Sequence, residues 1–291
     1  MTNRSILKWA GGKGSIINDV KKHLPPGKRL IEPFVGAGNV FINTDYDEYI
    51  LNDINYDLIN VYEQLYKQPD KFIVCLLEEF SGGNNADVFG YARNSFNSLD
   101  NTTDGNRFMR AVLFVYLNRH CFNGLCRYNQ KGQFNVPFGK FKSVYFPQAE
   151  LEMFATKLKK ATLFNLDFEE IINMAGYGDV VYCDPPYIPA SSTSDFTQYY
   201  TAGFTNHDQK RLRNALLRAV GRRASIVVSN SDTSLAQFLY HCFVVKRIKT
   251  HRSIGAASGS RKRVTELIAI KYPEISLKGL EPAAMWIEES L

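Results

Sequence analysis

The first third of the chain alternates between two spacings of apolar residues. Segments 29–34 and 48–53 are short, mostly apolar runs that are typical of buried strands. Segments 15–24, 38–43 and 58–67 instead repeat apolar residues at helical spacing, and the first of these is expected to stop at the prolines that follow it. Strands that alternate with helices in this way predict a parallel α/β sheet.

The alternation stops between about residues 68 and 147. Helical patterns dominate up to residue 119, and 108–119 is apolar enough for a buried helix. Residues 120–147 mix Asn, Gly, Arg, Lys and aromatic residues with little periodicity, and 129–132 can turn a hairpin. This composition suits a surface that grips a polar, flat ligand.

Strand and helix patterns then alternate again from about residue 148 to residue 272. Further strands are predicted at 162–167, around 180–182 and at 224–230, 242–248 and 264–272, with helices at 148–160, 168–175 and 207–220. We therefore expect an α/β domain in two pieces, 1–55 and 147–273. A mainly helical insert occupies 56–146, and the tail 274–291 has no assigned role.

Composition narrows the class of protein only a little. The 291 residues are 45% hydrophobic and 22% charged, as in ordinary globular proteins, and the net charge of +6 suits a nucleic-acid partner without requiring one. The five Cys are odd in number and form no CxxC pair, which argues against a disulfide framework or a zinc site and favours a reducing, cytoplasmic setting. No apolar run approaches the ~20 residues of a membrane span.

The stretch EPFVGAGNVF (32–41) places Gly36 and Gly38 between a predicted strand and a predicted helix. Glycines there let the backbone approach a ligand, and Asp53, at the end of the next strand, can accept hydrogen bonds from ribose hydroxyls. The third glycine of the dinucleotide pattern is replaced by Phe41, so a pyrophosphate ligand is not favoured. A tight turn that only packs helix on sheet remains an alternative.

The stretch LKWAGGK (7–13) precedes that strand. It is either a loop that covers a ligand or a glycine turn with a core tryptophan and two solvated lysines. Taken alone, these residues favour the glycine turn.

CDPPY (183–187) is more specific, because it ends an apolar strand with a carboxylate, two prolines and an aromatic ring. Proline has a fixed φ and no N–H, so Pro185 and Pro186 hold the chain extended and leave carbonyl oxygens without local donors. Asp184 and the Pro185 carbonyl can then both accept from one –NH₂ group, while Tyr187 stacks on the ring that carries the amine. The motif lies at the carboxyl end of its strand, and open α/β sheets bind ligands at the carboxyl ends of their strands.

LKWAGGK, EPFVGAGNVF and DPPY, in this order around a helical insert, resemble the adenine-specific DNA methyltransferases of the Dam family. The resemblance covers about residues 5–272 and includes YLNRHCFNGLCRYN, FNVPFG, VVSN and RSI…RKRVTELIA. It implies a Rossmann-like methyltransferase sheet with helices on both faces and an inserted DNA-recognition domain. It also implies S-adenosyl-L-methionine as methyl donor, no metal, and methyl transfer to the exocyclic nitrogen of an adenine flipped out of the duplex.

The resemblance assigns roles residue by residue. Asp184, Pro185, Pro186 and Tyr187 would form the target-base pocket. The cofactor-binding residues would be Trp9, Gly11, Gly12, Lys13, Gly36, Gly38, Asp53, Asp167 and Asp184.

The insert would read double-stranded DNA, for which the family's usual site is GATC. The DNA-binding residues would be Lys8, Phe122, Asn123, Leu125, Arg127, Pro137 and Lys140. Lys8 and Arg127 would read guanines, Leu125 and Pro137 would touch a thymine methyl group, and Phe122 would be the wedge where a tyrosine is expected, with Asn123 beside it. Lys140, Lys142 and the basic loop 252–263 would contact phosphate. We expect a monomer that acts in the cytoplasm of a bacterium, at the nucleoid, and is encoded by the bacterium or a phage.

Other classes of protein remain as alternatives. Methyltransferases for cytosine or for a glutamine amide share this chemistry, although Asp rather than Ser or Asn at position 184 favours adenine. A DNA-binding protein without catalysis conflicts with the full set of candidate catalytic residues, and a nicotinamide oxidoreductase conflicts with the missing third glycine.

Overall fold

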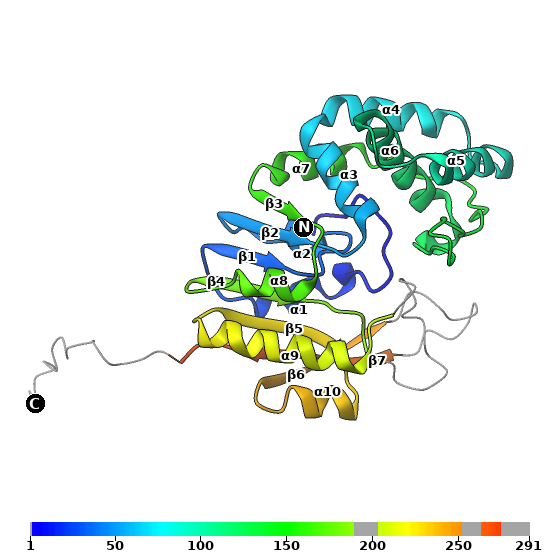
Figure 1. Ribbon diagram of the computed structural model, residues 1–291. Helices are drawn as coiled ribbons and strands as arrows, with labels where there is room; N and C mark the ends of the chain where they lie inside the picture. Colours follow the sequence, from blue (N-terminus) through cyan, green and yellow to red (C-terminus); the bar gives the residue numbers. More distant parts are fainter. Residues whose placement is uncertain (1, 189–202, 252–262, 275–291) are drawn as a thin grey trace, which may run out of the picture.

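The computed structural model describes residues 2–188, 203–251 and 263–274, so most of the predicted basic loop lies outside the described residues. This part of the chain builds one seven-stranded sheet in the order β3-β2-β1-β4-β5-β7-β6 (Figure 1). The strands are β1 (Arg29–Glu32), β2 (Glu48–Asn52), β3 (Ala161–Phe164), β4 (Asp179–Cys183), β5 (Ser225–Ser231), β6 (Val244–His251) and β7 (Arg263–Lys271).

The parallel pairing predicted from the first third holds from β3 through to β5. β7 differs, because it runs antiparallel to both of its neighbours, β5 and β6. β6 and β7 are consecutive along the chain and lie side by side, so no crossover helix is needed between them and the pair is antiparallel.

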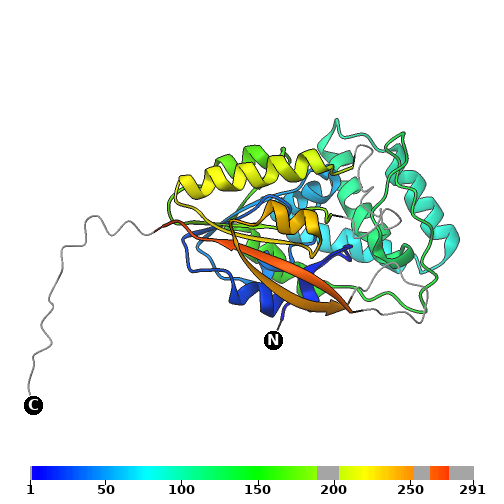
Figure 2. The ribbon, with the colours of Figure 1, turned by 90° about the horizontal axis from the view of Figure 1, so that it is seen from below.

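Helices cover both faces of the sheet (Figure 2). Side chains alternate along each strand, so Leu30 and Val180 face one layer whereas Ile31 and Val181 face the other. The first layer contains α1 (Ile17–Lys22), α2 (Asn39–Asn43), α3 (Tyr56–Lys67) and α7 (Gln148–Leu158). The second contains α8 (Phe168–Asn173), α9 (Asn206–Gly221) and α10 (Ser234–Leu239). The fold is therefore the predicted α/β sheet with helices on both faces.

Between β2 and β3 the chain adds α4 (Pro69–Ser81), α5 (Ala86–Ser98) and α6 (Asp104–His120) after α3. These helices and the loop that follows α6 gather at the end of the sheet to which β1, β2 and β4 point (Figures 1 and 2). One continuous apolar core joins them to the sheet, since α3 packs against both β3 and α6. The helical segment is thus held firmly over the carboxyl ends of the strands.

The strand order reverses its direction of growth between β1 and β4. β1 leads to β2 on one side, and β4 leads to β5 on the other, so the loops after β1 and β4 leave in opposite directions. Open α/β sheets bind ligands in the crevice that such a reversal creates. In the described part of the chain no helix is both long and apolar enough to cross a membrane.

Candidate active site

The turn after β1 depends on glycine at two positions. Gly36 has φ +47° and Gly38 has φ +70°, a region that side chains disfavour. A Cβ atom on Gly38 would also lie 2.9 Å from the ring of Phe154, and one on Gly36 would lie 3.0 Å from the ring of Trp9. At both positions the space that a side chain would need is filled by an aromatic ring, so the turn requires glycine.

Asp53, immediately after β2, fixes this turn from the neighbouring strand. Its carboxylate accepts hydrogen bonds from the N–H of Gly36 at 3.0 Å and from the N–H of Asn55 at 2.9 Å. The Tyr62 hydroxyl donates to the carbonyl of Gly36 at 2.5 Å. Burial raises the pKa of Asp53 to about 6. Each carboxylate oxygen keeps a further lone pair for a ligand hydroxyl.

Three phenylalanines meet at the same edge of the sheet. Phe34 follows β1 and stacks on Phe168, with ring centres 5.4 Å apart, and Phe204 packs against both rings. Asp167, which precedes Phe168 in the chain, caps α8 and forms an ion pair with Arg211 at 2.9 Å. Asp167, predicted to bind the cofactor's adenine, thus lies beside an aromatic cluster whose faces suit a flat ring.

Asp184 ends β4 as predicted, and two side chains hold one of its oxygens. The Lys13 ammonium lies 2.7 Å from Oδ1, and the Ser229 hydroxyl donates to the same atom at 2.8 Å. Lys13 also donates to the Gly11 carbonyl and lies 4.7 Å from the centre of the Tyr187 ring. Among the described residues, neither contact uses Oδ2, so one carboxylate oxygen remains to accept a hydrogen bond.

The proline pair is anchored from the sheet and from α9. Gln209 donates to the Pro186 carbonyl at 2.8 Å, whereas no donor from the described residues reaches the Pro185 carbonyl. The Tyr187 hydroxyl donates to Glu266 on β7 at 2.9 Å. Burial and the carboxylates of Asp184 and Glu266 hold the pKa of Tyr187 well above its usual range. Tyr187 is therefore a neutral ring with a fixed orientation.

The amino-terminal loop connects the two halves of this site. The N–H of Gly12 donates to the carbonyl of Trp9, and Gly11 adopts φ +74°, which allows the tight turn. The Trp9 ring lies against Gly36, and Lys13 reaches Asp184. The structure thus places Trp9 at the glycine turn and Lys13 at the predicted base pocket.

On the helical side, Lys8 lies in a half-buried position against the end of α6. Its ammonium donates to the Arg119 carbonyl at 3.0 Å and lies 3.9 Å from the centre of the Phe141 ring. Loss of solvation and the nearby Arg119 charge lower the pKa of Lys8. The buried Asn118 side chain exchanges two hydrogen bonds with the Lys8 backbone. Lys8 is thus fixed at the base of the recognition loop.

That loop starts with a 3-10 turn, η2 (Phe122–Gly124). Gly124 packs so closely on Lys8 that an added Cβ would lie 2.2 Å from the Cβ of Lys8. Asn123 has φ +54°, which asparagine tolerates better than most residues. The Phe122 side chain is 50% exposed although it is large and apolar. An exposed ring on a rigid turn is what an intercalating wedge requires.

Arg127 lies beyond this turn, on the predicted hairpin. A β-bridge joins Tyr128 to Phe134, and the N–H of Gly132 closes the turn on Asn129. Arg127 is exposed, and its Nε donates to the Asn135 side chain at 2.8 Å. Of the other predicted contacts, Leu125 is half-buried, whereas Pro137 and Lys140 are exposed. Apart from Lys8, which packs against it from the amino-terminal segment, the predicted DNA-binding residues therefore lie on one connected loop.

Four residues support the pocket without having been assigned a role from sequence. They are Ser229, Asn230, Gln209 and Glu266. Ser229 and Asn230 belong to the polar run that ends the otherwise apolar strand β5, and together with Glu266 they lie in the stretches VVSN and RKRVTELIA that carry the resemblance, which gave them no role. Gln209 carries no signal, because a helix surface contains many polar residues.

Comparison with known proteins gives a consistent result. The model for the D12 class of N6 adenine-specific DNA methyltransferases matches residues 9–254. A DNA adenine methylase of Serratia marcescens is 46% identical over 273 residues, which cover 92% of this chain and 98% of that protein. The DNA adenine methylases of Salmonella typhi and Escherichia coli K12 are each 44% identical and cover 94% of this chain and 97% of their own length.

Proposed function

The chain belongs to the D12 class of N6 adenine-specific DNA methyltransferases, and from that premise we propose that it methylates the adenine of GATC in double-stranded DNA. The methyl group would come from S-adenosyl-L-methionine, and the adenine would be flipped out of the duplex. The observation that carries the proposal is that one amino-terminal loop contacts both parts of the site, with Trp9 against the glycine turn at Gly36 and Lys13 against Asp184 and Tyr187. Acceptors for an amine thus lie beside a surface shaped for a nucleoside-type cofactor.

The residues present fit the cofactor. The methionine part would pass along the glycine turn at Gly36 and Gly38, and the carboxylate of Asp53, which is fixed to that turn, can accept from both ribose hydroxyls. Phe34, which is half-buried and stacks on Phe168, offers a ring for the adenine beside Asp167. Trp9, Gly11, Gly12 and Lys13 would close the site from the amino-terminal side. When bound, the sulfonium group supplies an electrophilic methyl, so no metal is needed in this mechanism.

The base pocket would act on the amine through hydrogen bonds. Asp184 Oδ2 and the Pro185 carbonyl can accept the two amine hydrogens, which favours a tetrahedral nitrogen with an available lone pair. Pro186 keeps the chain extended, and the Tyr187 ring supplies a stacking face. Because the amine of a stacked base cannot be reached, the adenine must leave the duplex first. The enzyme contributes alignment and electrostatics rather than covalent chemistry.

The recognition loop would read the site from the helical side. Phe122 would enter the base stack, with Asn123 filling the gap, and Leu125 and Pro137 would contact a thymine methyl group. Arg127 would read one guanine in the major groove. Lys8 would read the other with a proton that its bond to Arg119 does not use, since an ammonium has three. Lys140 would contact phosphate.

Different segments of the chain would have different roles. Residues 1–55 and 147–273 would carry cofactor binding and catalysis, 56–146 would recognise DNA, and 274–291 has no proposed role. We further propose that the protein acts as a monomer in the cytoplasm. The alternative of a DNA-binding protein without catalysis makes a clear contrast, because it predicts site-specific binding without methyl transfer.

The direct test is to incubate the protein with labelled S-adenosyl-L-methionine and unmethylated plasmid DNA, and to map every modified position. We expect N6-methyladenine in GATC on both strands, and no label with the Asp184→Ala variant. Label in cytosine, or in adenines without a shared sequence, would overturn the proposed specificity. Sequence-specific DNA binding with no label would support the non-catalytic alternative.

A further inference from the structure

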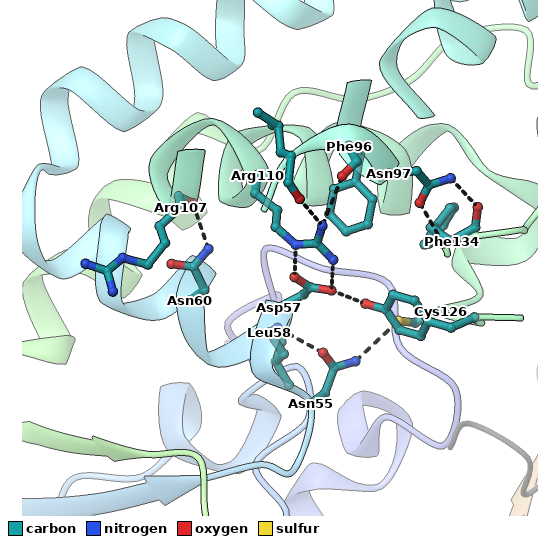
Figure 3. Close-up of polar contacts among 12 residues, drawn as sticks. Asn55, Asp57, Leu58, Asn60, Phe96, Asn97, Arg107, Arg110, Cys126 and Phe134 are labelled. Carbon is teal, nitrogen blue, oxygen red and sulfur yellow. Dashed lines mark hydrogen bonds and ion pairs between the residues drawn. The ribbon is translucent and has the colours of Figure 1, made fainter. Parts of the chain in front are cut away.

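The short segment 53–57, which joins β2 to α3, touches the catalytic side and the recognition loop at once. Asp53 holds the glycine turn, as described above. Two residues later, the Asn55 side-chain amide donates to the sulfur of Cys126 at 3.4 Å, and the Asp57 carboxylate accepts from the Tyr128 hydroxyl at 2.6 Å (Figure 3). The recognition loop is therefore attached to the same five residues that position the cofactor turn.

Arg110, from the middle of α6, locks Asp57 in place. Its Nε and Nη2 donate to the two Asp57 oxygens at 2.6 and 3.0 Å, and its Nη1 donates to the carbonyls of Phe96 and Leu99 (Figure 3). The two charged side chains are only 7% and 12% exposed. A buried, bidentate pair with further hydrogen bonds has a single favourable geometry, so Tyr128 is held by a rigid partner.

Tyr128 and Cys126 are the two sequence neighbours of Arg127. Cys126 is buried and Tyr128 is half-buried, whereas Arg127 is exposed. In an extended chain, successive side chains point to opposite sides, so anchoring residues 126 and 128 inward directs residue 127 outward. Asn135, on the other strand of the hairpin, then fixes the guanidinium through Nε. The direction in which Arg127 leaves the loop therefore depends on the contacts of its two neighbours as well as on its own bonds to Asn135.

We propose that Tyr128, Asp57 and Arg110 form a buried positioning triad that sets the sequence specificity of the enzyme by aiming Arg127 at its base. This inference rests on the proposed role of Arg127 in reading DNA. Removing the Tyr128 hydroxyl frees the loop at one anchor and leaves the Asp57–Arg110 pair intact. Discrimination between sites therefore falls, while cofactor binding and the fold are preserved.

The test compares Tyr128→Phe with a matched control, Tyr116→Phe. Tyr116 lies on α6, is fully buried, and likewise donates one hydrogen bond, but its acceptor is the Gly83 carbonyl at 3.1 Å and not Asp57. Methylation rates are measured on GATC duplexes and on duplexes altered at each outer base pair, together with cofactor affinity and melting temperature. Tyr128→Phe is expected to lower the cognate-to-altered ratio about tenfold at one outer pair, with cofactor affinity unchanged. Tyr116→Phe is expected to leave that ratio as in wild type.

A second variant covers the case in which Tyr128→Phe does not fold. Asn55 caps α3 by accepting from the N–H of Leu58, and serine caps helices equally well, so Asn55→Ser removes only the bond to Cys126. Asn55→Ser is expected to lower the preference at the same base pair to a smaller extent.

Arg127→Ala separates failure of this inference from failure of the proposed function. One outcome is that Arg127→Ala lowers the preference at one base pair while Tyr128→Phe and Asn55→Ser change it no more than the control does. In that case the positioning triad is wrong and the reading role of Arg127 stands. If Arg127→Ala changes no preference, both are overturned.

Discussion

The Lys13 ammonium and the Ser229 hydroxyl converge on the same oxygen of Asp184, at 2.7 and 2.8 Å. Lys13 comes from the amino-terminal loop, and Ser229 comes from the neighbouring strand β5. Together they set the rotation of the carboxylate, so that the other oxygen is directed by the protein before any base arrives. This arrangement makes the target pocket a preorganised acceptor.

Asp184→Asn keeps the size of the side chain but replaces one acceptor oxygen with a donor. Methyl transfer should fall by about 10²-fold or more, because a preorganised contact to the reacting group is lost. Cofactor affinity should change little, since Asp53 and the glycine turn hold most of the cofactor. Single-turnover rates and equilibrium cofactor titration measure the two effects separately. A rate within tenfold of wild type would contradict the assigned role.

Ser229→Ala removes the hydroxyl that orients Asp184, together with its contact to the buried Tyr182 hydroxyl, and leaves the backbone pairing of β5 unchanged. A hydrogen bond to a charged acceptor contributes about 1.5–3 kcal/mol, so kcat should fall roughly tenfold to a hundredfold. The KM for DNA should stay the same, because Ser229 is buried beneath the pocket. Ser225→Ala, at the other end of the same strand, is the control and should behave as wild type. Equal kcat in the two variants would remove Ser229 from the mechanism.

Tyr187 allows its ring and its hydroxyl to be tested apart. Stacking of a base on an aromatic ring contributes about 1–3 kcal/mol, so Tyr187→Ala should lose roughly tenfold or more in kcat/KM. Tyr187→Phe and Tyr187→Trp should retain more activity, because each keeps a flat face. Phe loses the bond to Glu266 and should therefore remain below wild type. If Ala, Phe and Trp are equally active, the stacking role is refuted.

The turns after β1 and β4 were predicted from short motifs, because the residues of each turn determine its backbone conformation. Gly36 and Gly38 adopt backbone angles that only glycine takes readily, and Pro185 and Pro186 restrict their own backbone, so both turns are legible in the sequence. Ser229 and Glu266 were missed because their roles arise only when distant strands pair. The contact between Asn118 and Lys8 spans 110 residues and has no local signature. The ends of the helix predicted at 15–24 were wrong. Only 17–22 is α-helical: residues 13–15 form a separate 3-10 turn before the helix, and His23 caps its other end.

Asp53 predicts a pH dependence of cofactor binding. Burial raises its pKa to about 6, so in the folded protein the carboxylate becomes protonated as the pH falls through 6. Ribose hydroxyls donate to the ionised form, and cofactor affinity should therefore fall about tenfold between pH 7.5 and pH 5. Asp53→Asn cannot titrate, so its weaker affinity should not change over this range. Calorimetric titration at several pH values measures both proteins, and parallel curves would exclude Asp53 as the titrating group.

Arg127 tests whether the recognition loop reads bases or only holds the backbone. Its exposed guanidinium donates to Asn135 through Nε and Nη2, which leaves Nη1 available to a base edge. Arg127→Ala should cost about 1–3 kcal/mol on GATC and relax preference at one outer base pair. Lys131, exposed at the tip of the same hairpin, is a charge-matched control, and Lys131→Ala should preserve the preference.

A phosphate contact by Arg127 would instead weaken binding to all sequences equally and lower the salt dependence of binding by roughly one unit. Methylation rates on GATC and on duplexes altered at each outer pair, at two salt concentrations, distinguish these outcomes. If every rate falls together for Arg127→Ala, Arg127 is a backbone contact and the guanine is read elsewhere.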